Sequence, residues 1–268
     1  RKLAPAETLL LDKYEEWGSH PLINLALGEI FFLKDNIATS LQYLKIAYEN
    51  GKNIPSVVVY YAEKLRLNDE TTRAKEVLQI AILNRPCDKV LLESYANFCL
   101  TDQNPLESLK FNFRLLLLFP NYSTGHTNIA EAYAALDNYE KSLEHQNIAI
   151  KYDTGSQVKL NRAITLLTLE QYQEGWAEYE NRLGDDIISS PRRRLRVPRW
   201  NWQPLQDKTI LVCSEQGVGD ELYFSSYLPK LIEISGKVIL ETDQRLTHLF
   251  KESLGEISVF PYSRRVVY

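Results

Sequence analysis

A loop rich in glycine and acidic residues is the segment of this chain best suited to hold a small ligand. It reads Ser214-Glu-Gln-Gly-Val-Gly-Asp220 and follows a short apolar run. We expect Gly217 and Gly219 to allow unusual backbone angles and close approach of a ligand, because glycine has no Cβ. Backbone amides at the start of the next helix can also hold an anion. Leu222 rules out the dinucleotide motif G-x-G-x-x-G, and no Gly-Lys-Ser/Thr follows to make a phosphate loop.

A second set of polar residues recurs at a fixed interval of 34 positions in the first part of the chain. The set comprises Glu29, Glu63, Asn97 and Glu131. Three carboxylates at matching positions predict an acidic stripe that could bind a basic or polar extended segment. The alternative is solvated surface charge, since charged residues usually face water and Lys64 and Arg66 lie nearby in the sequence. The sequence leaves both interpretations open.

Two asparagines lie close to this polar set. Asn128 and Asn161 occupy equivalent positions, 33 residues apart. An amide side chain can donate to and accept from the main chain of a bound peptide. The corresponding positions elsewhere hold Ala26, Tyr60 and Ser94, so the row of amides is not continuous. We therefore favour hydrogen bonds between neighbouring repeats over a peptide clamp.

These residues recur because the whole segment repeats. Small residues return every 34 positions in three columns: Gly28, Ala62, Ala96 and Ala130; Ser40, Ala74, Ser108 and Ser142; and Ala47, Ala81 and Ala149, with Leu115 as the large member of the third column. Two helices pack closely only where neither side chain is bulky. The large apolar residues between these columns have helical spacing. The pattern predicts antiparallel helical pairs over residues 21–183, with residues 3–18 as the second helix of an earlier, incomplete pair.

This pattern resembles the tetratricopeptide repeat, which has the same period and the same small-residue columns. An unrelated helical bundle is the alternative, but a bundle needs no fixed period. The resemblance implies a superhelix of stacked pairs, with a concave face lined by the first helix of each pair. The polar set and the two asparagines would then lie along a groove for a protein or peptide partner.

A basic segment joins the repeats to the rest of the chain. Residues 184–204 carry five arginines against two acidic residues, whereas the segments before and after are acidic. The arginines are Arg192, Arg193, Arg194, Arg196 and Arg199. They could bind phosphate or an acidic partner, or could cover the acidic repeats. We expect Trp200 and Trp202 to anchor this linker between two domains, since indoles bury a large area, and favour this over stacking on a ligand.

The hydrophobic pattern changes at Thr209. Short apolar runs typical of buried parallel strands cover residues 209–213, 237–241 and 257–260. Helical spacing covers residues 222–234 and 244–254. Gly236 is expected to end the first of these helices. Strands that alternate with helices predict right-handed crossovers and a parallel sheet.

The order of motifs along the chain carries a second resemblance. EGWAEYENRL is followed by PRWNWQPL, by SEQGVGDELYFSSYLPKL and by GKVILE. Over residues 160–260 this order is similar to bacterial proteins in which such repeats precede a glycosyltransferase with two Rossmann lobes, related to heptosyltransferases and O-linked sugar transferases. The resemblance implies that Asp220 is a general base, that Glu215 and Gln216 bond sugar hydroxyls and that the two glycines shape the site. A helix cap, for a helix starting at Glu221, is the alternative role of Asp220.

The expected fold is mainly α, in three parts: a tetratricopeptide superhelix over residues 1–183, a linker over 184–204 and a partial α/β Rossmann-like lobe over 205–268. Nothing after Phe260 could form the second lobe that would bind a nucleotide-sugar donor. We expect a partner-binding repeat domain joined to part of a glycosyltransferase acting on a protein or glycan acceptor, with this chain alone inactive. The alternatives are a non-catalytic adaptor with a degenerate α/β cap, and binding of a peptide or nucleotide sugar without catalysis. Whether the chain is an enzyme stays open.

Composition argues against several classes of protein. A net charge of -4, from 31 basic and 35 acidic residues, argues against a protein that coats nucleic acid. The longest apolar run, Leu115 to Phe119, is far shorter than the roughly 20 residues of a membrane helix. Cys87, Cys99 and Cys213 lack metal-type spacing, which favours free thiols in a reducing compartment and a cytoplasmic protein.

The sequence predicts neither a metal site nor a covalently bound cofactor. The histidines, which are His20, His126, His145 and His248, form no metal-type pairs. His126 and His145 fall in one repeat and could approach each other, and we favour interior packing as their role. The chain starts at Arg1 and contains no Met, so we expect either a processed or excised fragment or a sequence from which some residues are missing.

Overall fold

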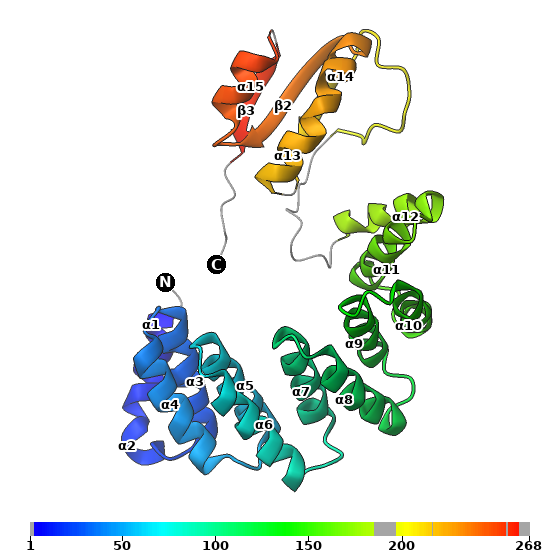
Figure 1. Ribbon diagram of the computed structural model, residues 1–268. Coiled ribbons are helices and arrows are strands. Elements are labelled where there is room, and N and C mark those ends of the chain that lie inside the picture. The colour runs from blue at the N-terminus through cyan, green and yellow to red at the C-terminus, as the bar shows by residue number, and fades with distance from the viewer. Residues whose placement is uncertain (1–2, 185–196, 216, 256, 263–268) are drawn as a thin grey trace. The chain divides into compact units, whose positions relative to one another are not determined.

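The computed structural model describes residues 3–184, 197–215, 217–255 and 257–262, and the chain divides into two compact parts. The first, Arg1–Glu180, is called the helical unit, and the second, Asn181–Tyr268, the α/β unit (Figure 1). Each unit is described by itself. None of the helices in these described ranges is long and apolar enough to cross a membrane.

The helical unit consists of antiparallel helical pairs. After α1 (Leu3–Asp12) and α2 (Tyr14–Trp17), the chain forms α3 (Pro21–Leu33) with α4 (Ile37–Asn50), α5 (Pro55–Leu67) with α6 (Thr71–Asn84), α7 (Lys89–Thr101) with α8 (Pro105–Leu118), α9 (Ser123–Ala134) with α10 (Tyr139–Tyr152), and α11 (Ser156–Thr168) with α12 (Tyr172–Tyr179), followed by the 3-10 turn η1 (Glu180–Leu183). The predicted pairs over residues 21–183 are confirmed. The single helix predicted over residues 3–18 is wrong, because Lys13, with φ -87° and ψ -6°, interrupts the helical register.

Small residues let the two helices of each pair approach closely. The first two columns found in the sequence are fully or almost fully buried at the crossings, on first and second helices respectively. A Cβ on Gly28 would lie 2.5 Å from Leu44, so the crossing of α3 and α4 has no room for it. Ser40 Oγ also donates to the carbonyl oxygen of Gly28 over 2.6 Å. The predicted columns therefore mark the helix crossings.

A left-handed residue lies in the turn inside each of these pairs. Asp35, Asp69, Gln103, Asp137 and Glu170 have φ values of 61°, 62°, 55°, 56° and 60°. The next residue precedes the second helix, and at Asn36, Asn104 and Asn138 its side chain accepts a hydrogen bond from a backbone N–H three residues later. The turn therefore repeats with the same period as the helix crossings.

The first helix of each pair lies on the inner side of the arc that the helical unit forms (Figure 1). First helices also contact one another, since α3 contacts α5, α5 contacts α7 and α7 contacts α9. The core between the pairs is filled by large apolar residues such as Leu65, Leu92 and Tyr95. The first helices α3, α5, α7 and α9 therefore form one continuous layer.

The described part of the α/β unit contains a three-stranded parallel sheet. Its order is β1 (Thr209–Cys213), β2 (Lys237–Asp243) and β3 (Ser258–Tyr262). Alternate residues of β2 are buried, and Leu240 packs with Leu228 and Phe250 in one apolar cluster. The predicted parallel strands are confirmed, and the assignment of this small sheet to a Rossmann-like lobe stays a prediction.

The helix predicted over residues 222–234 is broken. It is replaced by α13 (Val218–Phe224), the 3-10 turn η2 (Ser225–Tyr227) and α14 (Leu228–Ile234). Pro229 lies in the first turn of α14, has no N–H to donate and crowds the preceding turn, which favours a break there. The last helix, α15 (Thr247–Ser253), is shorter than the predicted span of 244–254.

Gly236 has a role beyond the predicted one. Ser235 terminates α14, and Gly236 lies where β2 approaches the segment before β1. A Cβ on Gly236 would lie 2.8 Å from the backbone of Asp207. Gly236 thus directly follows the C-cap of α14, as predicted, but without the positive φ of a glycine cap, and its main role is close backbone contact.

Candidate functional site

The polar set predicted from the sequence occupies exposed positions on consecutive first helices. Glu29 lies on α3, Glu63 on α5, Asn97 on α7 and Glu131 on α9, and each is exposed. Tyr60 of α5 lies near the first two carboxylates. Burial, together with Glu29 and Glu63, raises the pKa of Tyr60 to about 12, so its phenol keeps its proton. An apolar ring with a hydroxyl donor therefore lies among acidic groups on the first helices.

The two asparagines tie neighbouring first helices together. Asn128 Nδ2 donates to Asn97 Oδ1 over 2.7 Å, which joins α9 to α7. Asn161 Nδ2 donates to Glu131 Oε1 over 3.4 Å, which joins α11 to α9. Burial raises the pKa of the Glu131 carboxyl, although part of its side chain reaches solvent. These contacts agree with hydrogen bonding between repeats, and a role of the asparagines in partner binding stays a prediction.

A buried lysine lies beside the acidic stripe. Lys64 is 8% exposed, and its Nζ lies 3.9 Å from the ring centroid of Phe32 and 4.7 Å from that of Tyr60. Nζ is also 3.6 Å from Glu63 Oε1. Lys64 therefore offsets the negative charge of Glu63, as predicted. It does so as a buried cation between two aromatic rings and not as a solvated surface charge. The spacing of four residues from Tyr60 to Lys64 is the sequence signal from which this contact could have been predicted.

The loop after β1 keeps ordinary backbone angles. Gly217 has a φ of -83°, and among the described glycines a positive φ occurs at Gly255 alone. A Cβ on Gly219 would meet no atom within 4 Å. The unusual angles expected at Gly217 and Gly219 are therefore absent from the described structure, since the first precedes a regular helix and the second is part of it. Gln216 lies outside the described residues.

Glu215, the other predicted sugar-binding residue, is engaged in an ion pair. Its Oε1 lies 2.8 Å from Arg182 Nε. Ser214, directly before it, is buried, and its N–H donates to the carbonyl oxygen of Glu241 over 2.9 Å. The start of the loop is thus held by β2 on one side and by an arginine on the other.

Asp220 folds back onto the start of its own helix. Because α13 begins at Val218, Asp220 is the third helical residue, and its Oδ2 accepts a hydrogen bond from the Gly217 N–H over 3.2 Å. A capping role is therefore present, but from within the first turn and not as the residue before a helix starting at Glu221. Asp220 is exposed, and its role as a general base stays a prediction.

The carboxylate that reaches the sheet is Glu221. Its Oε2 accepts hydrogen bonds from Thr242 Oγ1 over 2.6 Å and from the Asp243 N–H over 3.0 Å. It thereby holds α13 against the carboxyl end of β2, the edge at which parallel sheets bind ligands. Sequence reasoning did not find this role, because no local spacing connects Glu221 with a threonine 21 residues later.

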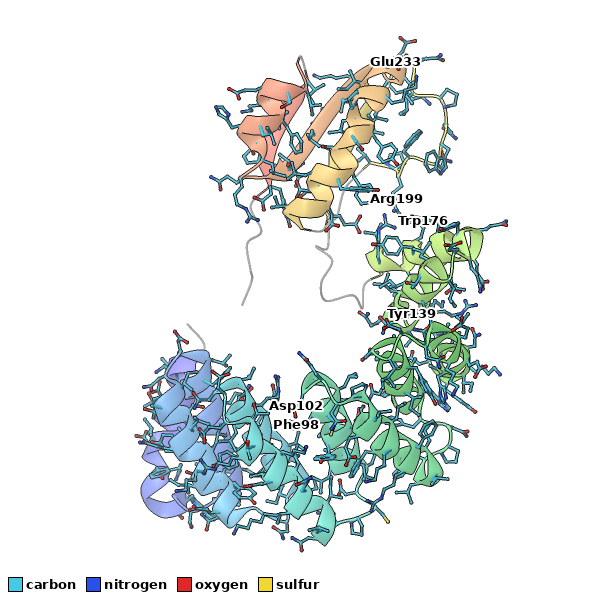
Figure 2. All side chains as sticks on the ribbon, in the orientation of Figure 1. Phe98, Asp102, Tyr139, Trp176, Arg199 and Glu233 are labelled. Carbon is cyan, nitrogen blue, oxygen red and sulfur yellow. The ribbon has the colours of Figure 1, made fainter. Side chains whose placement is uncertain are left out.

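The described part of the basic linker starts at Val197. Arg199 lies within it and is labelled in Figure 2. The other four arginines, Arg192, Arg193, Arg194 and Arg196, lie outside the described residues. The rings of Trp200 and Trp202 lie 4.8 Å apart, yet the residues are 38% and 85% exposed. Trp202 has a φ of 69°, and the turn there directs its ring toward Trp200. Within the α/β unit the two indoles are thus exposed, and their role as an anchor of the linker stays a prediction.

His126 and His145 do meet inside one helical pair, with their Nδ1 atoms 3.1 Å apart. In the parts of the chain that the structure describes, no group of three or more His, Cys, Asp or Glu side chains is arranged to hold a metal ion.

Comparison with known proteins relates the chain to longer proteins. No family model matches it. It is 29% identical over 202 residues to Protein FlbA of Caulobacter vibrioides, covering 73% of this chain and 34% of that protein. It is 27% identical over 160 residues to the TPR repeat-containing protein YpiA of Bacillus subtilis, covering 59% of this chain and 38% of that protein. The chain thus spans about a third of the length of these curated relatives.

Solved structures resemble the helical part of the chain. A tetratricopeptide repeat protein from Parabacteroides merdae superposes with a TM-score of 0.58 at 16% sequence identity, covering 67% of this chain and 72% of that one. Likeness at this level of identity shows the fold alone. Combined with the helix crossings marked by small residues every 34 positions, it shows that the helical unit has the tetratricopeptide-repeat fold.

Proposed function

We propose that the helical unit binds an extended basic or polar segment of a partner protein along its first helices, and that the chain is an adaptor. The observation that supports this is the recurrence of Glu29, Glu63 and Glu131 at exposed, equivalent positions. Carboxylates repeated on successive helices can pair with lysine or arginine side chains of a segment that crosses those helices. Tyr60 would add an apolar contact between the first two carboxylates.

The test is binding of a fluorescent peptide of alternating arginine and serine to the chain, followed by anisotropy at low and moderate salt. The double variant Glu29→Gln/Glu63→Gln removes two charges from the stripe. Exposed charge contacts contribute about 0.5–1 kcal/mol each, so we expect affinity to fall about 5- to 30-fold, with less salt dependence.

A matched control variant removes the same number of negative charges, but from second helices. Glu49 of α4 and Glu76 of α6 are exposed, so Glu49→Gln/Glu76→Gln has the same net charge as the test variant. The control should bind the peptide almost as tightly as the unchanged chain. Equal losses in both double variants would mean that net charge alone attracts the peptide, and the proposed groove would be wrong.

A second candidate function belongs to the α/β unit. We propose that it is the first lobe of a glycosyltransferase in a longer protein, with a nucleotide sugar as donor. Support comes from the placement of the Ser214–Asp220 loop after the carboxyl end of β1, next to the Glu221 contact with the end of β2. In this proposal Asp220 takes the proton of the acceptor hydroxyl, and Glu215 and Gln216 bond sugar hydroxyls.

Asp220→Asn separates the two roles of this residue. The amide oxygen of Asn can still accept from the Gly217 N–H, so the start of α13 is preserved while the base is lost. We expect the longer protein to lose at least 100-fold in sugar-transfer rate with unchanged thermal stability. Transfer at the full rate would exclude the base role, and calorimetric titration of nucleotide sugars would separately test donor binding.

A further inference from the structure

Two imidazoles form a tight pair inside the α9–α10 helical pair. His126 of α9 is 8% exposed, and its Nδ1 lies 3.1 Å from Nδ1 of His145 on α10. The ring centroids are 5.3 Å apart. His126 Nε2 also lies 3.4 Å from the carbonyl oxygen of Pro120. Contacts on both ring nitrogens fix the position of His126.

The two preceding helical pairs, α5–α6 and α7–α8, place apolar residues at these two positions. Counting back by 34 residues, His126 corresponds to Leu92 and Val58, which are 0% and 1% exposed. His145 corresponds in the same way to Phe111 and Val77, which belong to the apolar core or pack against it. The α9–α10 pair therefore carries two titratable groups where the two pairs before it carry apolar contacts.

One tautomer of the neutral pair satisfies both hydrogen bonds. A carbonyl oxygen only accepts, so His126 Nε2 donates to Pro120, and His126 Nδ1 then carries a lone pair. His145 Nδ1 must therefore carry the hydrogen that lies between the rings. A first added proton can go to His145 Nε2 without breaking this contact. A second proton would place two N–H groups against each other across 3.1 Å, which the rings can relieve only by separating.

The surroundings of the pair are mostly aromatic. Phe113 of α8 and Tyr133 of α9 lie 5.9 Å and 5.8 Å from the His145 ring, and Tyr152 of α10 lies 6.4 Å from the His126 ring. Among the described residues, Glu144 of α10 is the carboxylate that acts on His145. Burial lowers the pKa of both imidazoles, and for His145 it outweighs the opposing effect of Glu144.

We propose that the His126–His145 pair is an acid-sensitive latch that opens the α9–α10 pair when both imidazoles become protonated. Because α9 carries Asn128 and Glu131, opening would also break the hydrogen bonds that join it to α7 and α11. The stack of helices would then be interrupted between α8 and α11. A partner segment bound along the first helices would lose its contacts with α9.

The sign and size of the effect follow from proton binding. An open pair titrates near pH 6.5, the ordinary value for His, whereas the closed pair resists protonation. The open state therefore binds more protons, and the closed state loses stability as the pH falls through 6.5. Between pH 7.5 and 5.5 each imidazole that is protonated only in the open state favours opening about tenfold, so the pair favours opening about 10- to 100-fold.

Hydrogen exchange of the whole chain at pH 7.5 and 5.5, corrected for intrinsic exchange rates, tests this latch. We expect amides of α9 and α10 to open far more at pH 5.5, while those of α5 and α6 change little. The variant His126→Leu/His145→Phe, which installs the residues of the α7–α8 pair, should remove the difference. His248→Gln, at an exposed histidine of α15, should keep it. An unchanged pH effect in the double variant, or none in the original chain, would overturn the proposal.

A second measurement decides the matter even where the double variant does not fold. Histidine ring signals in nuclear magnetic resonance should show His126 and His145 titrating below the ordinary histidine value in the unchanged chain. If both are fully protonated at pH 5.5 while α9 and α10 stay protected, the pair tolerates two charges and is no latch.

Discussion

The left-handed turn residues are not equally suited to their backbone angles. Asp and Asn tolerate a positive φ better than other residues with side chains. Gln103, with a φ of 55°, has a longer side chain and is exposed. Glycine accepts these angles without steric cost, so we predict that Gln103→Gly raises the free energy of unfolding by about 0.5–1 kcal/mol, measured by urea denaturation.

The control places glycine on an ordinary helical backbone. Lys110 is exposed in α8, so Lys110→Gly changes flexibility and leaves the core untouched. This variant should lose about 1 kcal/mol of stability. If both glycine variants were destabilised alike, the positive φ at Gln103 would not be a source of strain.

The Glu131 carboxyl should make the free energy of unfolding depend on pH. Burial raises its pKa, so the folded chain binds its proton more tightly than the unfolded chain does. The contribution of Glu131 to stability is therefore fully present at a pH below the ordinary pKa of glutamate. It is lost as the pH rises through the raised pKa of the folded chain. We predict that Glu131→Gln is more stable than the original chain at pH 7, by less than about 1 kcal/mol because the site is partly solvated, and equal to it near pH 4.

The matching substitution at the other end of the stripe is the control for Glu131. Glu29→Gln has the same change in charge, at a carboxyl that is also exposed on a first helix. Comparing urea midpoints of both variants at pH 7 and pH 4 separates the burial of Glu131 from a general effect of net charge. Equal pH dependence of the two variants would contradict the prediction.

At the scale of elements, one helix seam changes from apolar to polar along the chain. Leu44 and Leu78 of α4 and α6 are buried, and the equivalent position in α8 is Asn112, at 0% exposed. Asn112 Nδ2 donates to Ser108, but among the described residues its Oδ1 has no hydrogen-bond partner. We predict that Asn112→Leu raises the free energy of unfolding by about 1–3 kcal/mol, since an unpaired buried oxygen is replaced by an apolar contact.

The reciprocal change provides the control. Leu78→Asn places an amide in the apolar seam of α6 and should cost at least 2 kcal/mol, the lower range for losing a buried leucine. Opposite signs for the two variants in urea denaturation would show that the seam prefers leucine. Loss of stability in both would show that Asn112 is paired, for instance through an ordered water.

Some elements could be predicted from the sequence and others could not, for physical reasons. Helical pairs were predictable because each crossing needs a small residue and the crossings recur, as Gly28 and its successors show. The break before α14 was missed because apolar spacing continues through Pro229, although proline at that point was a readable signal. The contact of Glu221 with Thr242 was out of reach, because it depends on how α13 packs against β2.

At the scale of the whole molecule, a repeat array is stabilised by its pairs and by the interfaces between them. The acidic stripe could be predicted because it shares the period of the array. The sequence predicts that the asparagines form hydrogen bonds between repeats, but not which residues they bond. The pairing of Asn128 with Asn97 depends on how far apart α7 and α9 lie. These bonds cross interfaces between pairs, so they bear on how cooperatively the array unfolds.

The hydrogen bond from Asn128 to Asn97 should cost a different amount of stability depending on which of the two residues is replaced. Asn128 is 7% exposed, whereas Asn97 is exposed. Asn128→Ala leaves Asn97 free to bond with water and should cost about 1 kcal/mol, while Asn97→Ala strands a buried amide and should cost about 1–3 kcal/mol. The double variant should cost less than the sum of the two, because the stranded amide is gone. A cycle of Asn97→Ala with Asn161→Ala, whose side chains do not pair with each other, should be additive within about 0.5 kcal/mol. Additivity in both cycles would mean that this bond does not couple α7 to α9, and that the first helices are held together by packing alone.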